Sequence, residues 1–144
     1  AARLPDARFH VVGSGLDEAL SRELAGERIE VHGHVADLDP YLDGCRLAVA
    51  PLRYGAGVKG KVNLGMAHGQ PVVATPAAVE GMNLVAGEDV LVGATAAEFA
   101  DAIVRLYHDA ALWQRLSDRG IENVRRHFSF DAARAALARI LPSR

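Results

Sequence analysis

The chain has 144 residues, of which 50% are hydrophobic and 24% charged, and its formal net charge is −2 at pH 7. This composition is typical of one compact soluble domain and excludes a disordered chain, and the charge gives no basic footprint for nucleic acid. The single cysteine, Cys45, excludes an internal disulfide and is interpreted as a core residue rather than a nucleophile. The sequence has neither a membrane-length apolar run nor a signal-peptide pattern, so we predict a cytoplasmic protein. Peripheral association of the full-length protein with a membrane stays an alternative.

Short apolar runs alternate with helical patterns over the first two thirds of the chain. Glycine, proline or aspartate bounds most of them, as in strands and helices joined by tight turns. The pattern predicts strands over 8–12, 29–35, 46–52, 71–75 and 90–92. Between them it predicts a helix over 16–24, with leucines at 16, 20 and 24, and a short helix that is capped by Asp39 and reaches about Asp43. A further helix is predicted within 57–68 and ends at Gly69.

The last third of the chain is predicted to be helical. Thr95 and Glu98 have the spacing of a capping box, which begins a helix. Residues 112–128 predict a second helix, interrupted or bent near Gly120. Ser129 is predicted to cap a last helix, whose apolar residues are Ala133, Leu137, Ile140 and Leu141.

Strands separated by helices indicate right-handed βαβ units. We therefore predict a single domain over 1–144 of the α/β class, a Rossmann-like doubly wound parallel sheet of about five or six strands with a helical C-terminus. Ligands of such sheets bind beyond the carboxyl ends of the strands. The informative segments are therefore 13–15, 33–35, 51–60 and 75–81.

The glycine- and lysine-rich segment 53–61 is the strongest chemical signal, because it lies between a predicted strand and a predicted helix. Free backbone N–H groups and the helix dipole make such a helix start an anion site. The spacing does not fit a Walker loop, and a solvated glycine loop with surface lysines stays an alternative. The turn Gly13-Ser14-Gly15 lacks the third glycine of a dinucleotide fingerprint, since that position is Glu18, so a tight turn is favoured there.

Two histidines, His32 and His34, are expected on one side of an extended chain. A metal ion would need a third ligand, and none is near in sequence, so no metal site is predicted. Glu80 follows the fourth strand, where it can reach a ligand hydroxyl or lie in a surface turn. No arrangement of Ser, His, Cys and Asp defines a nucleophilic site, so the catalytic residues stay unassigned.

Four blocks carry a family resemblance. They are VVGSG at 11–15, IEVHGHV at 29–35, RLAVAPLRYGAGVKGKV at 46–62 and MAHGQPVVATPAAVEGM at 66–82, followed by VRRHFSFDAA at 124–133. Their order and spacing resemble the C-terminal, nucleotide-sugar-binding domain of the GT-B glycosyltransferases of family 4, the "group 1" glycosyltransferases. The resemblance implies one half of a GT-B architecture that serves retaining, metal-independent transfer of a hexose.

The resemblance also implies a set of binding residues for the donor, a nucleotide-diphosphate sugar. Gly13 and Gly15 would lie near the sugar phosphate, and His34 and Val35 near the base. The diphosphate would bind at Gly57, Val58 and Lys59, with Lys61, Asn63 and Glu80 completing the set. Two glutamates that the family often carries are replaced here by Ala56 and Leu64, which leaves Asn63 as a substitute for the ribose contact.

The resemblance implies no metal and no other cofactor. The acceptor, a glycan or a lipid-linked glycan, would bind through an N-terminal domain that this chain lacks, so the isolated chain is expected to be inactive. Two alternatives remain: a degenerate member that binds a nucleotide without turnover, and a non-enzymatic domain for phosphate sensing or interaction.

Overall fold

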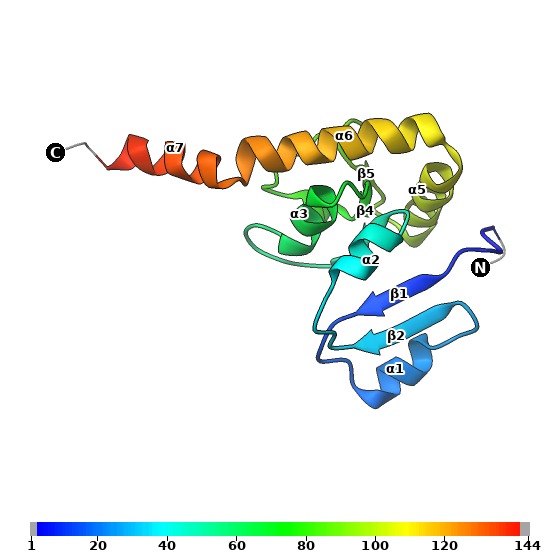
Figure 1. Ribbon diagram of the computed structural model, residues 1–144. Coiled ribbons are helices and arrows are strands. Elements are labelled where there is room, and N and C mark those ends of the chain that lie inside the picture. Colours follow the sequence, from blue (N-terminus) through cyan, green and yellow to red (C-terminus); the bar gives the residue numbers. More distant parts are fainter. Residues whose placement is uncertain (1–2, 142–144) are drawn as a thin grey trace. The chain divides into compact units, whose positions relative to one another are not determined.

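The computed structural model describes residues 3–141 and divides into two compact units, one ending at Gly44 and the other beginning at Cys45 (Figure 1). The first unit contains β1 (Phe9–Val12), α1 (Glu18–Leu24), β2 (Ile29–Gly33) and α2 (Asp39–Gly44). The second contains β3 (Ala48–Ala50), α3 (Gly60–Ala67), β4 (Val72–Ala74), α4 (Pro76–Val79), β5 (Leu91–Val92), α5 (Ala96–His108), α6 (Ala110–His127) and α7 (Phe130–Ile140).

The first unit is one parallel βαβ crossover. Phe9 pairs with Ile29 and His10 with Glu30, and the register shifts between Val11 and Val12. Helix α2 begins at Asp39, whose amide donates to the carboxylate of Asp37 at 3.0 Å. Asp39 is therefore the first residue of the helix, whereas the Asp-Pro pair predicted it as the residue before the first.

The second unit is built on a three-stranded parallel sheet in the order β3-β4-β5. The middle strand is buried on both faces, as is usual for a parallel strand covered by helices. Val72 and Ala74 belong to one hydrophobic cluster with Met66 of α3. Val73 faces the other way, into a cluster with Leu106 of α5 and leucines of α6. The sheet thus holds α3 against one face and α5 against the other.

The predicted α/β class, parallel pairing and helical C-terminus are confirmed. The number of sheets differs from the prediction, because the five strands within residues 3–141 form two small sheets whose ladders lie within each unit. The strands are also shorter than the apolar runs that predicted them. Gly33 has a φ of 64° and ends β2, and Pro51 has no N–H to extend the ladder of β3.

The predicted capping box at the start of α5 is confirmed. The hydroxyl of Thr95 accepts the Glu98 amide at 3.2 Å, and the Glu98 carboxylate accepts the amides of Thr95 and Ala94 at 3.0 and 2.9 Å. Those amides lower the pKa of Glu98. Ser129 caps α7 as predicted, accepting the Ala132 amide at 3.1 Å. Capping is a local interaction, which is why the sequence alone predicts it.

The predicted interruption of a helix at Gly120 is wrong. Helix α6 runs without a break through this residue and begins at Ala110, capped by Asp109. A Cβ at Gly120 would lie 3.0 Å from Cγ of the buried Met66, so the missing side chain lets α3 pack closely against α6.

Helix α4 was not predicted. In α7 the predicted apolar residues Leu137 and Ile140 are exposed.

None of the helices within the described residues is both long and apolar enough to cross a membrane. Cys45 is half-buried rather than fully buried, and burial raises the pKa of its thiol. A thiol held in its neutral form is a poor nucleophile. The interpretation of Cys45 as a packing residue is thus compatible with its surroundings.

Candidate functional site

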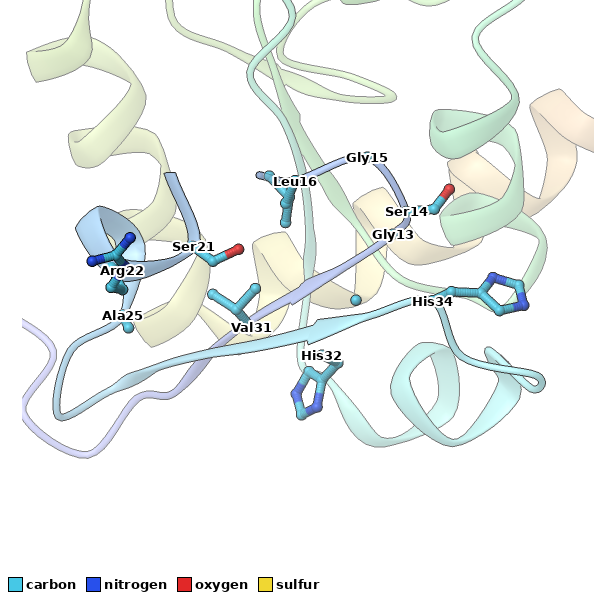
Figure 2. A pocket seen from close by; sticks show the side chains of 11 residues that line it. Gly13, Ser14, Gly15, Leu16, Ser21, Arg22, Ala25, Val31, His32 and His34 are labelled. Carbon is cyan, nitrogen blue, oxygen red and sulfur yellow. The ribbon is translucent and has the colours of Figure 1, made fainter. Parts of the chain in front are cut away.

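An open groove of about 680 Å³ lies in the first unit, between the carboxyl ends of β1 and β2 and the side of α1 that carries Ser21 and Arg22 (Figure 2). Gly13 and Gly15 form part of its wall, and His34 lies at its edge. A Cβ on either glycine would meet no atom within 4 Å, so the space beside this turn is open. Val35, half-buried, follows His34 directly. The groove therefore exposes backbone that a ligand can approach closely.

The sequence suggested that His32 and His34 lie on one side of the chain, but in the structure they do not. Figure 2 shows their rings pointing in different directions. The cause is Gly33, whose φ of 64° ends the strand and breaks the alternation of side chains on which that prediction depended. The ring of His32 instead meets His10, with 2.9 Å between the two facing nitrogens.

The first missed feature is therefore the cluster of His10, Glu30 and His32, whose ligand atoms lie within 4.8 Å of one another. These residues could have been connected through the pairing of β1 with β2, since His10 and Glu30 lie directly opposite each other in the two strands. That pairing is readable only once the register is known, because 20 residues separate the two in sequence.

The glycine loop in the second unit joins β3 to α3. The Thr75 hydroxyl, at the end of β4, donates to the Leu52 carbonyl at 2.5 Å and fixes the start of this loop. Further along, Gly57 adopts a φ of 71°, which favours glycine, and Val58 beside it is 59% exposed. The loop begins at the carboxyl end of β3, which is the end of a parallel sheet where ligands usually bind.

Helix α3 begins at Gly60 with free hydrogen-bond donors. The amide of Lys59 is occupied by the Met82 sulfur at 3.2 Å, and the amides of Val62 and Asn63 return to the Lys59 carbonyl at 3.0 and 3.3 Å. Within residues 3–141, no acceptor faces the amides of Gly60 and Lys61. These two N–H groups point out of the positive end of the helix dipole and can receive an anion.

The Lys59 side chain is the second component of this helix start. The residue is only 7% exposed, and its ammonium donates to the Glu80 carbonyl at 2.8 Å. Its stem runs beside Gly55, where a Cβ would lie 3.8 Å from Lys59 Cε. Among the described residues no carboxylate pairs with this ammonium. A nearly buried positive charge without a negative partner is costly, and an anionic ligand would offset that cost.

The remaining predicted residues of this unit lie around the same helix. Lys59 and Glu80 are brought together through the Glu80 carbonyl, whereas the Glu80 side chain is exposed, as is Lys61. Asn63 Oδ1 is buried and has no hydrogen-bond partner. Leu64 is 40% exposed, and Ala56 is also exposed. The two positions that lack the expected glutamates are therefore both at the surface.

The profile of a family described as glycosyl transferases group 1 matches residues 1–109. No curated protein matches the sequence. Sucrose-phosphate synthase from Thermosynechococcus elongatus is 24% identical, with a TM-score of 0.79 over 96% of this chain and 39% of that protein.

Two further structures resemble the chain. The C-terminal domain of a glycosyl transferase group 1 family protein from Francisella tularensis is 18% identical, with a TM-score of 0.67 over 78% of this chain and 62% of that one. Anabaena HepE, in complex with UDP, is also 18% identical, with a TM-score of 0.76 over 94% of this chain and 41% of that protein. The chain thus spans about two fifths of the two longer proteins.

Proposed function

The chain belongs to the group 1 glycosyl transferases, and from this membership we propose that it binds the nucleotide-diphosphate sugar that donates the sugar. The observation that carries the proposal is the start of α3, where two free amides and the ammonium of Lys59 face no negative partner among the described residues. A diphosphate supplies the missing negative charge. Its oxygens would accept from the Gly60 and Lys61 amides, next to Gly57 and Val58 of the loop.

The same contacts would serve the transfer step. When the bond between the sugar and the diphosphate breaks, negative charge builds up on the leaving diphosphate. Amides already fixed at the end of a helix stabilise that charge without reorganising, and Lys59 adds a full positive charge. We therefore propose a transfer that needs no metal ion. From the resemblance to the retaining group 1 enzymes, we also propose that it keeps the configuration at the anomeric carbon. The acceptor, a glycan or a lipid-linked glycan, would be bound by a separate N-terminal domain.

The groove of the first unit, taken by itself, is proposed to contact a sugar phosphate and a nucleobase. The open backbone at Gly13 and Gly15 admits close approach of a sugar phosphate. The exposed ring of His34, with Val35 beside it, offers a surface against which a nucleobase can pack. In the second unit, Asn63 is proposed to contact the ribose with Oδ1, an acceptor now without a partner.

A nucleoside diphosphate is expected to bind this chain in the presence of a chelator. UDP is the first probe, since HepE is in complex with it. Isothermal titration calorimetry with UDP, ADP and GDP, each with and without EDTA, measures the effect. Binding of none of the three, or binding that disappears in EDTA and returns with Mg²⁺, would contradict the metal-free anion site.

The variant Leu64→Glu is expected to strengthen the binding of ribose nucleotides. Leu64 is 40% exposed, so a carboxylate fits there without burial, and it can accept hydrogen bonds from the ribose hydroxyls. A hydrogen bond to a charged group contributes roughly 1.5–3 kcal/mol, so the affinity for UDP should rise about ten-fold. Calorimetry with UDP and 2′,3′-dideoxy-UDP is the measurement. A gain that is equal for both nucleotides would show that the carboxylate does not contact the ribose.

The absence of carboxylates at positions 56 and 64 also supports a second candidate function. A member that binds a nucleotide diphosphate but does not turn it over would keep the α3 anion site and lose the donor-sugar contact. Competition between UDP and UDP-sugars distinguishes the two candidates. A donor-binding domain should bind at least one UDP-sugar more tightly than UDP, whereas a degenerate domain should gain nothing from the sugar.

A further inference from the structure

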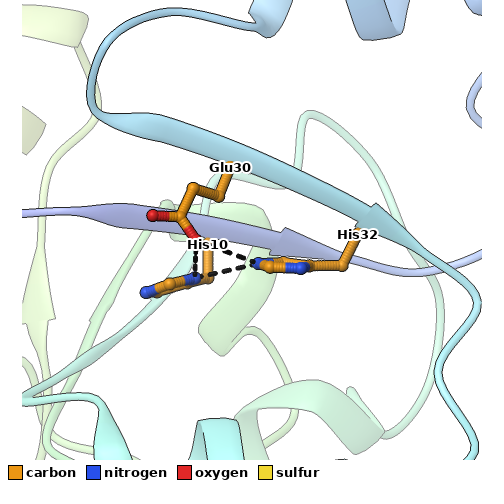
Figure 3. A group of neighbouring side chains, drawn as sticks. All are labelled: His10, Glu30 and His32. Atoms are coloured by element: carbon orange, nitrogen blue, oxygen red, sulfur yellow. Dashed lines mark hydrogen bonds and ion pairs between the residues drawn. The ribbon is translucent and has the colours of Figure 1, made fainter.

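Two histidines and a glutamate from neighbouring strands meet on one side of the first unit (Figure 3). His10 of β1 pairs in register with Glu30 of β2, and His32 follows two residues later, so the three side chains share one face of the strand pair. His10 Nδ1 lies 2.9 Å from His32 Nε2 and 3.5 Å from Glu30 Oε2, and the last two atoms are 3.8 Å apart.

The strand irregularity of the first unit lies at this cluster. Val11 pairs with Val31 and Val12 with Gly33, so His32 is an extra residue in β2 with no partner in β1. An extra residue of this kind bends the strand and re-aims a side chain. The His32 and His10 rings lie edge to edge, with 5.2 Å between the centroids and 22° between the planes (Figure 3). The two rings are therefore held with one nitrogen of each facing the other.

The surroundings hold the carboxylate in position. Arg8 donates to Glu30 Oε1 at 2.7 Å, which leaves Oε2 for the histidines. This hydrogen bond lowers the pKa of the Glu30 carboxyl, so Glu30 is ionised at neutral pH. The ring of Tyr41, from α2, lies 4.9 Å from the His32 ring. The side chains of His10, Glu30 and His32 are 25%, 37% and 24% exposed, so an ion can reach them from solvent.

We propose that His10, Glu30 and His32 form a Zn²⁺ site that joins β1 to β2. Ligands at tetrahedral angles, about 2.0–2.1 Å from zinc, lie about 3.3 Å apart. The three separations found here lie on both sides of that value, and rotation of the two imidazole rings, which turns their facing lone pairs toward a common point, completes the site. Any hydrogen between the two nitrogens moves to the outer nitrogen of its ring, and water fills the fourth position.

The ligand set favours zinc over the common hard cations. Mg²⁺ and Ca²⁺ prefer oxygen ligands alone, whereas imidazole nitrogens suit Zn²⁺ and its neighbours in the periodic table. Arg8 has the role of the outer partner that usually orients a ligating carboxylate. The ligands come from two strands that only the fold brings together, so zinc binds the folded protein and stabilises it by mass action.

Zinc titration of the whole chain tests the proposal. Calorimetry with ZnSO₄ at neutral pH should give one Zn²⁺ per chain. The variants His10→Gln and His32→Gln should each weaken the binding at least ten-fold. The matched control is His127→Gln, which removes an exposed histidine of α6 and should leave zinc binding unchanged. No zinc binding by the wild type, or equal binding by the double variant His10→Gln/His32→Gln, would overturn the site.

A second measurement needs no variant and so does not depend on whether a variant folds. Zinc-edge X-ray absorption of the wild-type chain with one equivalent of Zn²⁺ should show two imidazoles and oxygen ligands at about 2.0–2.1 Å. Sulfur at about 2.3 Å would indicate binding at Cys45, and fewer than two imidazoles would indicate surface binding. Either spectrum would overturn the proposal, and neither would affect the nucleotide site proposed at α3.

Discussion

Replacing Gly93 with alanine should lower the stability of the protein by about 3 kcal/mol, the upper end of the usual cost of overpacking. Gly93 is buried directly after β5, and its amide donates to the Ala74 carbonyl of β4 at 3.0 Å. An alanine Cβ would overlap the Phe99 amide nitrogen and lie 2.5 Å from Phe99 Cα. Backbone atoms cannot rotate away as a side chain can, so the whole first turn of α5 must move.

Thermal unfolding followed by circular dichroism measures this effect. A loss of about 3 kcal/mol in a chain of this length corresponds to a fall of about 10 °C in the melting midpoint. The control is Gly26→Ala, because a Cβ at Gly26 meets no atom within 4 Å and its φ is not positive. If both variants melt within about 2 °C of the wild type, α5 does not pack against the end of β5 as described.

The parts of the fold that depend on local interactions could be predicted from the sequence. Thr95 and Glu98 meet across one helical turn, and their capping box needs no other part of the chain. Gly120 is the opposite case. Its low helix propensity predicts an interruption or a bend, but α6 is not interrupted, and the close contact with Met66, 54 residues earlier, makes a glycine fit inside the helix. Local patterns cannot reveal such a contact, because tertiary packing overrides propensity.

The strand prediction failed in the extent and the grouping of the strands. The apolar run over 46–52 marks β3 correctly, but only Ala48–Ala50 pairs in the sheet. Apolar character reports burial, whereas a strand also needs a neighbour that takes its hydrogen bonds. The neighbours of each strand are set by the whole chain, so the division into two small sheets could not be derived from periodicity.

The candidate site shows the same limit. The position of the glycine loop after β3 follows from the order of strands and helices, so the sequence indicated the start of α3. The hydrogen bond of Lys59 to the Glu80 carbonyl could not be predicted, because it uses a backbone atom 21 residues away. The zinc ligands were missed for a related reason. The sequence suggests that His32 lies beside His34, but Gly33, with a φ of 64°, ends the strand between them, and the pairing of β1 with β2 brings His10 to His32 instead.

Lys59→Met should weaken the binding of UDP at least ten-fold and leave the binding of uridine unchanged. Methionine keeps an unbranched stem beside Gly55 and removes the ammonium, so packing is largely preserved while the charge is lost. A contact between a charged donor and a phosphate contributes roughly 1.5–3 kcal/mol, and 1.4 kcal/mol is a factor of ten in affinity. Only one of the three ammonium hydrogens is needed for Glu80, which leaves two for phosphate oxygens.

The matched control for this variant is Lys61→Met, two residues further along the same helix start. Lys61 is exposed, so solvent screens its charge, and its loss should reduce UDP affinity only about two- to five-fold, as for other surface charges. Calorimetry at low salt with UDP and uridine, together with a melting curve for each variant, separates loss of the phosphate contact from loss of structure. If Lys59→Met weakens UDP and uridine by the same factor, Lys59 serves the packing around Glu80 and not the diphosphate. If it weakens neither, the anion binds elsewhere, and the nearly buried ammonium is stabilised by the Glu80 carbonyl alone.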